Sequence, residues 1–201
     1  DDVESRGLGD VYKRQSLDHA AERFRYLYEA YLKDAGSRVY LSLIPDKNYF
    51  MAAPNGYPSI DYEQFAEELQ SRTGYMQYID IFDLLELEDY YRTDAHWRQE
   101  KILDVAARLA GGMGVELTGS YTRKTLEKPF YGVYYGQAAL PIAPEEMNYL
   151  TGGAIDTAAV YNYETDTEGG IYDAEKAAGR DPYEMFLSGS VSLLRIENPQ
   201  N

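Results

Sequence analysis

Apolar residues in the first half of the chain recur at helical spacing in three segments. They share one helical face over residues 17–35, where Ser16 suits the N-cap position and Gly36 the C′ position. The same spacing predicts helices over about residues 61–72 and 95–110, and a glycine follows each of them. These segments predict three helices separated by connections of ordinary length.

Two short apolar runs, at residues 38–44 and 75–82, lie between these helices and have the composition of buried strands. Strands that alternate with helices form a parallel sheet through right-handed crossovers. The pattern therefore predicts an α/β fold in which helices cover both faces of a parallel sheet. A site in such a fold is expected at the carboxyl edge of the strands.

The second half has a different pattern. Residues 121–137 alternate between charged and aromatic side chains, and residues 158–164 alternate like an exposed strand. A turn at residues 166–170 makes a hairpin plausible. We expect a tyrosine-rich, partly antiparallel insertion over about residues 118–180, followed by a short helix and a last strand near residues 192–196.

The ends of the chain suggest a metagenomic fragment. Residues 1–15 have no hydrophobic period and resemble translated adapter sequence, so we expect a non-native leader there. Residues 16–201 would then form a partial domain, incomplete at both ends. A signal peptide or membrane anchor, if the native protein has one, would precede this fragment.

Composition excludes several classes of function. The chain has 19 Lys and Arg against 34 Asp and Glu, a formal net charge of −15, which makes nucleic acid an unlikely partner. Without cysteine there is no disulfide or thiolate metal site, and the two histidines lack the spacing of a zinc motif. No glycine-rich nucleotide loop occurs, and no apolar run reaches the roughly 18 residues of a membrane span. We therefore expect neither a metal nor a cofactor.

The candidate chemistry lies at Asp94 and His96, within the segment 90–97 that is expected to connect a strand to a helix. A carboxylate two residues from a histidine can accept the proton of one ring nitrogen and leave the other nitrogen free as a base. The alternative is structural, because Asp94 before a helix can act as an N-cap that contributes about 1 kcal/mol. His19, the other histidine, has no such partner and is assigned no role.

Five further residues are weaker candidates for substrate binding: Trp97, Lys47, Tyr134, Tyr135 and Gln137. Lys47 follows the first predicted strand and could bind an anionic group, although an exposed turn lysine is the simpler interpretation. Trp97 suits a core or pocket wall, since indole offers one donor and a large apolar face. The two tyrosines and Gln137 could line a glycan groove or form a packed aromatic loop.

The residues at 43–49, 90–97, 132–137 and 181–189 together resemble the bacterial DHHW family, relatives of the SGNH-fold alginate O-acetyltransferases. The resemblance covers about residues 17–201. It implies an SGNH-hydrolase-like (flavodoxin-like) fold and a Ser-His-Asp triad. His96 would be the base and Asp94 its orienting carboxylate, with the serine later in the chain. Ala95 departs from the family name, because it stands where the first of the two histidines would be.

The resemblance also implies a function. It suggests a bacterial cell-envelope acyl-ester enzyme, an O-acetyltransferase or esterase acting on a surface polysaccharide or another acyl ester. The expected Asp-Ser-(Phe or Tyr) segment would follow residue 201, which would leave this fragment inactive; Ser190 and Ser192 are a poor second choice. The alternative is a non-catalytic envelope or glycan-binding protein of the same fold. Contact with a membrane is expected only through an N-terminal anchor.

Overall fold

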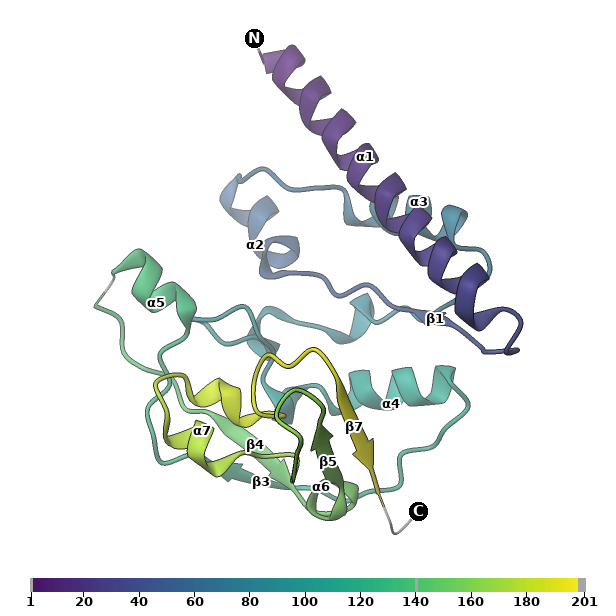
Figure 1. Cartoon of the computed structure of the whole chain (residues 1–201). Helices are drawn as coiled ribbons and strands as arrows, with labels where there is room; N and C mark the ends of the chain where they lie inside the picture. The colour runs from purple at the N-terminus through teal and green to yellow at the C-terminus, as the bar shows by residue number, and fades with distance from the viewer. Residues whose placement is uncertain (1, 140, 199–201) are drawn as a thin grey trace. The chain divides into compact units, whose positions relative to one another are not determined.

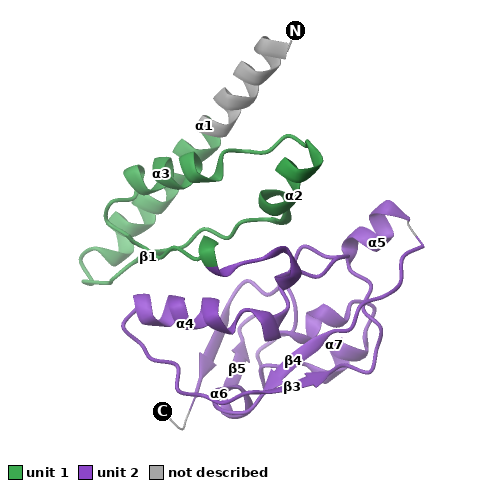
Figure 2. Ribbon diagram, turned by 180° about the vertical axis from the view of Figure 1, so that it is seen from behind, with its two compact units in different colours: residues 1–83 green, residues 84–201 purple. Residues whose placement is uncertain are grey.

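The computed structural model describes residues 2–139 and 141–198, with side chains described from Gln15 onward (Figure 1). The chain divides into two compact units, residues 1–83 and 84–201 (Figure 2). The hydrophobic pattern gives no sign of this division. The assignments of residues 1–15 as a leader and of about 118–180 as an insertion stay predictions.

Unit 1 contains four helical segments and two short strands. They are α1 (Asp2–Leu27), the π-helix η1 (Tyr28–Leu32), β1 (Tyr40–Leu41), α2 (Lys47–Asn55), α3 (Tyr62–Arg72) and β2 (Gln77–Tyr78). The 3-10 turn η2 (Phe82–Leu84) follows at the boundary between the units. Helix α1 continues through Ser16, so the N-cap prediction for that residue is wrong. Gly36 has a left-handed φ of 66°, but the helical segment ends at Leu32 with Lys33 as its C-cap, so Gly36 belongs to the turn that follows and its assignment to the C′ position is wrong.

Helix α3 forms where the sequence predicts it, because its N-terminus is capped and one face is apolar. The Asp61 carboxylate accepts the backbone N–H of Gln64 at 2.9 Å. Leu69 is buried, and Leu17 is buried on α1. Arg72 donates to Asp18 of α1 at 2.8 Å, so a polar contact joins the two helices beside these buried side chains.

Strands β1 and β2 pair in parallel, with Tyr40 opposite Gln77 and Leu41 opposite Tyr78. Both lie within the predicted strand segments but are only two residues long. The mixed helix-and-strand class is confirmed. Within residues 2–139 and 141–198, however, parallel pairing is limited to this ladder, and all other strand pairs are antiparallel. The larger parallel sheet with helices on both faces is not seen there.

Unit 2 contains short helices and two small antiparallel sheets. Its elements are η3 (Leu87–Asp89), η4 (Gln99–Lys101), α4 (Leu103–Gly112), β3 (Thr122–Thr125), α5 (Val133–Ala138), β4 (Asn148–Thr151), α6 (Ala154–Thr157), β5 (Ala159–Asn162), β6 (Thr167–Gly169), α7 (Ala174–Ala178), η5 (Pro182–Met185) and β7 (Leu194–Glu197). Strand β3 pairs with β4, and the second sheet has the order β6-β5-β7. A hairpin is present, but its turn was placed too late: β6 lies within the predicted turn at residues 166–170, and the chain reverses at residues 163–166. The predicted last strand is confirmed as β7.

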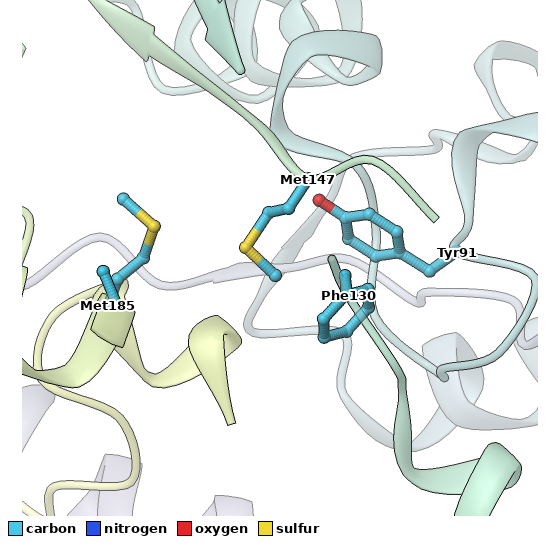
Figure 3. Packing of buried hydrophobic residues seen from close by; sticks show 5 residues of the cluster. Tyr91, Phe130, Met147 and Met185 are labelled. Atoms are coloured by element: carbon cyan, nitrogen blue, oxygen red, sulfur yellow. The ribbon is translucent and has the colours of Figure 1, made fainter. Parts of the chain in front are cut away.

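The core of unit 2 is assembled from segments far apart in the sequence. Tyr91, Phe130, Met147, Ala177 and Met185 form the buried cluster, and Figure 3 shows the first three beside one another. The rings of Tyr91 and Phe130 meet edge to face, with centroids 4.7 Å apart. Burial of each large apolar side chain contributes about 1.5–3 kcal/mol. Because Tyr91 belongs to this cluster, the core anchors the segment that carries Asp94 and His96.

Candidate active site

Residues 90–97 form a tight turn closed by an isolated antiparallel bridge between Tyr90 and Trp97. The backbone N–H of Tyr91 donates to the carbonyl of His96 at 3.1 Å. Helix α4 begins only at Leu103, and its N-cap is Ile102. The predicted helical start at residue 95 is therefore wrong, and Asp94 does not cap the helix that follows it.

Asp94 and His96 are joined directly inside this turn. The His96 Nδ1 and Asp94 Oδ1 atoms lie 2.5 Å apart, and the same oxygen accepts the His96 backbone N–H at 3.0 Å. The Asp94 side chain is 2% exposed, whereas that of His96 is 54% exposed. Among the described residues, Asp94 is the only hydrogen-bond partner of the His96 ring, so Nε2 has no hydrogen bond to them. The arrangement presents one imidazole nitrogen outward and holds the other against a buried carboxylate.

The second Asp94 oxygen is also occupied. Asp94 Oδ2 accepts the backbone N–H of Val133, the first residue of α5, at 2.9 Å. Burial alone raises the pKa of Asp94, but the N–H donors of Val133 and His96 and the His96 ring outweigh it and lower that pKa below its ordinary value. The carboxylate therefore stays ionised and can hold the imidazole by its Nδ1–H.

Gly132 allows α5 to approach the Asp94 turn closely. A Cβ atom at this position would lie 2.3 Å from the Thr93 carbonyl oxygen and 2.5 Å from Asp94 Cβ. The Gly132 N–H donates to Thr93 Oγ1 at 3.0 Å, and the Tyr134 N–H donates to the Thr93 carbonyl at 2.9 Å. Since the crowding involves backbone atoms, no side-chain movement could relieve it.

Glu145 holds the other side of the turn. Its carboxylate accepts the backbone N–H groups of Arg92 and Thr93 at 2.8 and 2.7 Å, the Thr93 hydroxyl at 2.7 Å and Arg98 Nη2 at 2.5 Å. The side chain is 6% exposed. Burial raises the pKa of Glu145, but the Thr93 hydroxyl, the two N–H donors and Arg98 together lower it. The sequence analysis missed Glu145, because nothing in the local pattern distinguishes it from Glu146.

Tyr183, in the 3-10 helix η5, lies against the His96 ring. The two ring centroids are 4.1 Å apart, and the planes are inclined by 23°. Burial, followed by the nearby charges of Asp94 and Asp181, raises the pKa of Tyr183 to about 12. Tyr183 lies in the segment 181–189 that carries the resemblance, but the sequence assigned it no role in the site. The Asp181 carboxylate caps the helical turn that holds it. Among 21 tyrosines, composition alone could not select it.

The weaker candidates are distributed over both units. Trp97 is half-buried, with its ring edge to face against Tyr90 at 6.3 Å, which fits a wall of the turn. Tyr134 and Gln137 are exposed on α5, whose first N–H binds Asp94. Tyr135, also on α5, packs against Tyr131 with centroids 4.7 Å apart. Lys47 is the first residue of α2 in unit 1, whereas Asp94 and His96 lie in unit 2. A role of Lys47 in substrate binding at the same site stays a prediction.

Among the serines whose side chains the structure describes, none donates its hydroxyl to the His96 ring. The exposed Ser192 donates its backbone N–H to Glu164 at 2.8 Å, and the Ser188 hydroxyl donates to Asp173 at 2.9 Å. In the part of the chain with described side chains, no cluster of three histidine or carboxylate side chains could hold a metal ion. None of the described helices combines the length and apolar character needed to cross a membrane.

A cavity of about 780 Å³ lies elsewhere in unit 2, lined by Leu126, Tyr149, Tyr172, Ala177, Met185 and neighbouring residues of β3 and α7. Neither Asp94 nor His96 lines it. Lys128, at its edge, donates to the carbonyls of Ala178 and Gly179 at the end of α7. This lysine is therefore held by a helix C-terminus, and its charge is not free for a ligand.

The chain is a mixed helix-and-strand protein with an Asp-His pair on a turn, in which the carboxylate is buried and the imidazole exposed. No protein-family model matches the sequence, and no curated protein matches it significantly. Two solved structures are similar. One is the O-acetyltransferase domain of Pseudomonas putida AlgJ, with 16% identity, a TM-score of 0.55, and coverage of 73% of this chain and 60% of that one. The other is Bacillus cereus PatB1, with 16% identity, a TM-score of 0.57, and coverage of 94% and 69%.

At this level of identity the likeness concerns the fold. The chain shares a fold with the AlgJ domain and PatB1, and it spans 60% of the length of the former. The relation to alginate O-acetyltransferases expected from the sequence thereby gains structural support. Membership of the DHHW family stays a prediction, because no family model matches.

Proposed function

We propose that this chain is part of a bacterial O-acetyltransferase or esterase that has an SGNH-like fold and belongs to the DHHW proteins. The chain supplies the aspartate and the histidine of the catalytic triad. Its substrate would be an acetylated polysaccharide of the cell envelope. The observation that carries the proposal is the buried Asp94 carboxylate 2.5 Å from the ring of an exposed His96. The fold shared with an O-acetyltransferase domain supports it.

In the proposed mechanism, the hydroxyl of a downstream serine attacks the carbonyl carbon of an acetyl ester, and Nε2 of His96 takes the hydroxyl proton. Asp94 holds the Nδ1–H and stabilises the imidazolium. When the tetrahedral intermediate collapses, His96 returns the proton to the leaving alkoxide, and the acetyl group stays on the serine. A sugar hydroxyl or water then repeats the steps, which completes transfer or hydrolysis.

One observation favours the second candidate, a non-catalytic envelope or glycan-binding protein. Asp94 has a structural role, because its carboxylate accepts the backbone N–H of Val133 at the start of α5. If the pair only joins this helix to the turn, polysaccharide binding without turnover is expected. Substitution of His96 would leave such binding unchanged.

The deciding experiment begins with the native gene beyond the codon for Asn201. If it encodes an Asp-Ser-(Phe or Tyr) segment, the extended protein should release acetate from p-nitrophenyl acetate and from acetylated polysaccharide. His96→Ala should then lower kcat/KM by about 10²–10⁴-fold or more. His19→Ala is the matched control, because this histidine is exposed on α1 and should leave activity unchanged.

Two outcomes would reject the enzyme. Activity retained in His96→Ala would show that another group acts as the base. A gene that ends at Asn201, with binding of polysaccharide but no turnover, would favour the glycan-binding alternative.

A further inference from the structure

The His96 ring is held by two contacts of different kinds. Its hydrogen bond to Asp94 fixes the position of Nδ1 but leaves the ring plane free to tilt about that atom. Tyr183 supplies the second contact, a stacked ring at 4.1 Å that covers one face of the imidazole. With 54% of the His96 side chain exposed, few other groups restrain it. The stack therefore fixes the plane of the imidazole ring, and with it the direction in which Nε2 points.

Tyr183 is itself firmly anchored. Its backbone N–H donates to the Asp181 carboxylate at 3.0 Å, and its neighbours Pro182 and Met185 are buried. Its ring lies 5.0 Å from that of Phe186 and 6.1 Å from that of the fully buried Tyr91. The same core that anchors the Asp94 turn thus anchors the aromatic ring that faces His96.

The phenol hydroxyl is not part of this arrangement. Within the described chain, Tyr183 Oη forms no hydrogen bond with another residue, and the contact with His96 is made by ring faces. With its pKa raised to about 12 by burial and by nearby carboxylates, the hydroxyl stays protonated at neutral pH. A phenylalanine at this position would keep the ring face and remove only the hydroxyl.

We propose that Tyr183 is a positioning residue for the Asp94-His96 pair, whose ring keeps the imidazole in the plane of the Asp94 hydrogen bond. Nδ1 then remains the protonated nitrogen and Nε2 the free base. This inference rests on the proposed function for its catalytic meaning. Its structural content can be tested without any catalysis.

The first experiment uses the chain as it is, labelled with ¹⁵N. The imidazole nitrogen chemical shifts at neutral pH report which nitrogen carries the proton. The wild type and Tyr183→Phe should show one predominant tautomer of neutral His96, with the proton on Nδ1. Tyr183→Leu should show shifts averaged between the two tautomers, because the ring can leave the Asp94 plane. Tyr149→Leu is the matched control, since Tyr149, like Tyr183, packs against the buried cluster but contacts Tyr172 and not His96.

Folding is checked by the dispersion of the backbone amide spectrum. If Tyr183→Leu does not fold, Tyr183→Met takes its place, because methionine fills a similar volume without a flat ring face. Tautomer populations unchanged in the folded Leu or Met variant would overturn the proposal. So would a change in Tyr183→Phe as large as that in Tyr183→Leu.

A second experiment uses the extended, active protein. Tyr183→Leu should lower kcat by about 10–100-fold with little change in KM, whereas Tyr183→Phe should have the kcat of the wild type. An unchanged kcat in Tyr183→Leu would reject the role in positioning the base. The tautomer populations could change in Tyr183→Leu while His96→Ala keeps full activity. In that case the proposed function is rejected, but the positioning of the His96 ring by Tyr183 is supported.

Discussion

Two turns of unit 2 close antiparallel pairs in opposite ways. The turn between β5 and β6 is held largely by its own residues: the Asn162 side chain accepts the N–H groups of Glu164 and Thr165, and the Tyr161 hydroxyl donates to Asp166. Two further bonds join it to the segment before β7, from the Ser192 N–H to Glu164 and from the Tyr163 N–H to the Leu193 carbonyl. The turn carrying Asp94 and His96 depends on Gly132, Val133 and Glu145, whose side-chain and backbone bonds to it span 39 to 53 residues. The hairpin turn forms most of its bonds within its own sequence, whereas the turn at residues 90–97, the site turn, depends more strongly on the folded unit.

Gly132→Ala should break the site turn most severely. The new Cβ would overlap backbone atoms of Thr93 and separate α5 from Asp94. We expect the free energy of unfolding to fall by about 3 kcal/mol or more, measured by urea denaturation. Gly136→Ala is the control, because nothing lies within 4 Å of a Cβ atom at that position of α5. It should be neutral or stabilise by up to about 1 kcal/mol. Equal stability of the two variants would contradict the close approach.

Glu145→Gln is expected to have the next largest effect. Glutamine offers one acceptor oxygen where the carboxylate receives four donors, and it leaves Arg98 without its charged partner. A loss of about 2–3 kcal/mol in urea unfolding is expected. Glu146→Gln changes the exposed neighbouring carboxylate and should stay within about 0.5 kcal/mol of the wild type. A small effect at both positions would show that Glu145 does not hold the turn.

Acid should weaken the site turn as well. The pKa values of Asp94 and Glu145 are lowered in the folded protein, so the ionised forms favour folding. Their stabilisation is complete above the ordinary carboxyl pKa of about 4 and is lost as the pH falls through the lower folded values. Urea midpoints between pH 7 and 3 should therefore drop in this acid range. Glu145→Gln should make the drop shallower, whereas Glu146→Gln should follow the wild type.

The comparison of the two turns explains what the sequence could predict. Strand β5 and helix α3 were predicted because alternation and helical spacing lie within the segments themselves, although the turn of the hairpin was placed a few residues too late. The hydrogen bond between Asp94 and His96 was predicted because the two residues are neighbours on one turn. Glu145 was not predicted, and Gly132 and Tyr183 were given no role although they lie in two of the segments that carry the resemblance, because the contacts of all three depend on the packing of distant segments. The helix predicted over residues 95–110 is present as α4, but its predicted start at residue 95 was wrong, because the bridge between Tyr90 and Trp97 and the bonds to Glu145 override helical spacing there.

Asn162→Ala should give the smallest effect and complete the comparison. It removes the side-chain oxygen that accepts the Glu164 and Thr165 N–H groups, bonds of 2.9 and 3.3 Å in an exposed turn. We expect a loss of about 0.5–1 kcal/mol, because water can replace the acceptor. Asn162→Asp keeps an acceptor oxygen and should retain most of the stability. Neither variant should change the ¹⁵N shifts of the His96 ring, whereas Glu145→Gln should. A hairpin variant that altered those shifts would mean that the two turns are coupled through unit 2 and are not held independently.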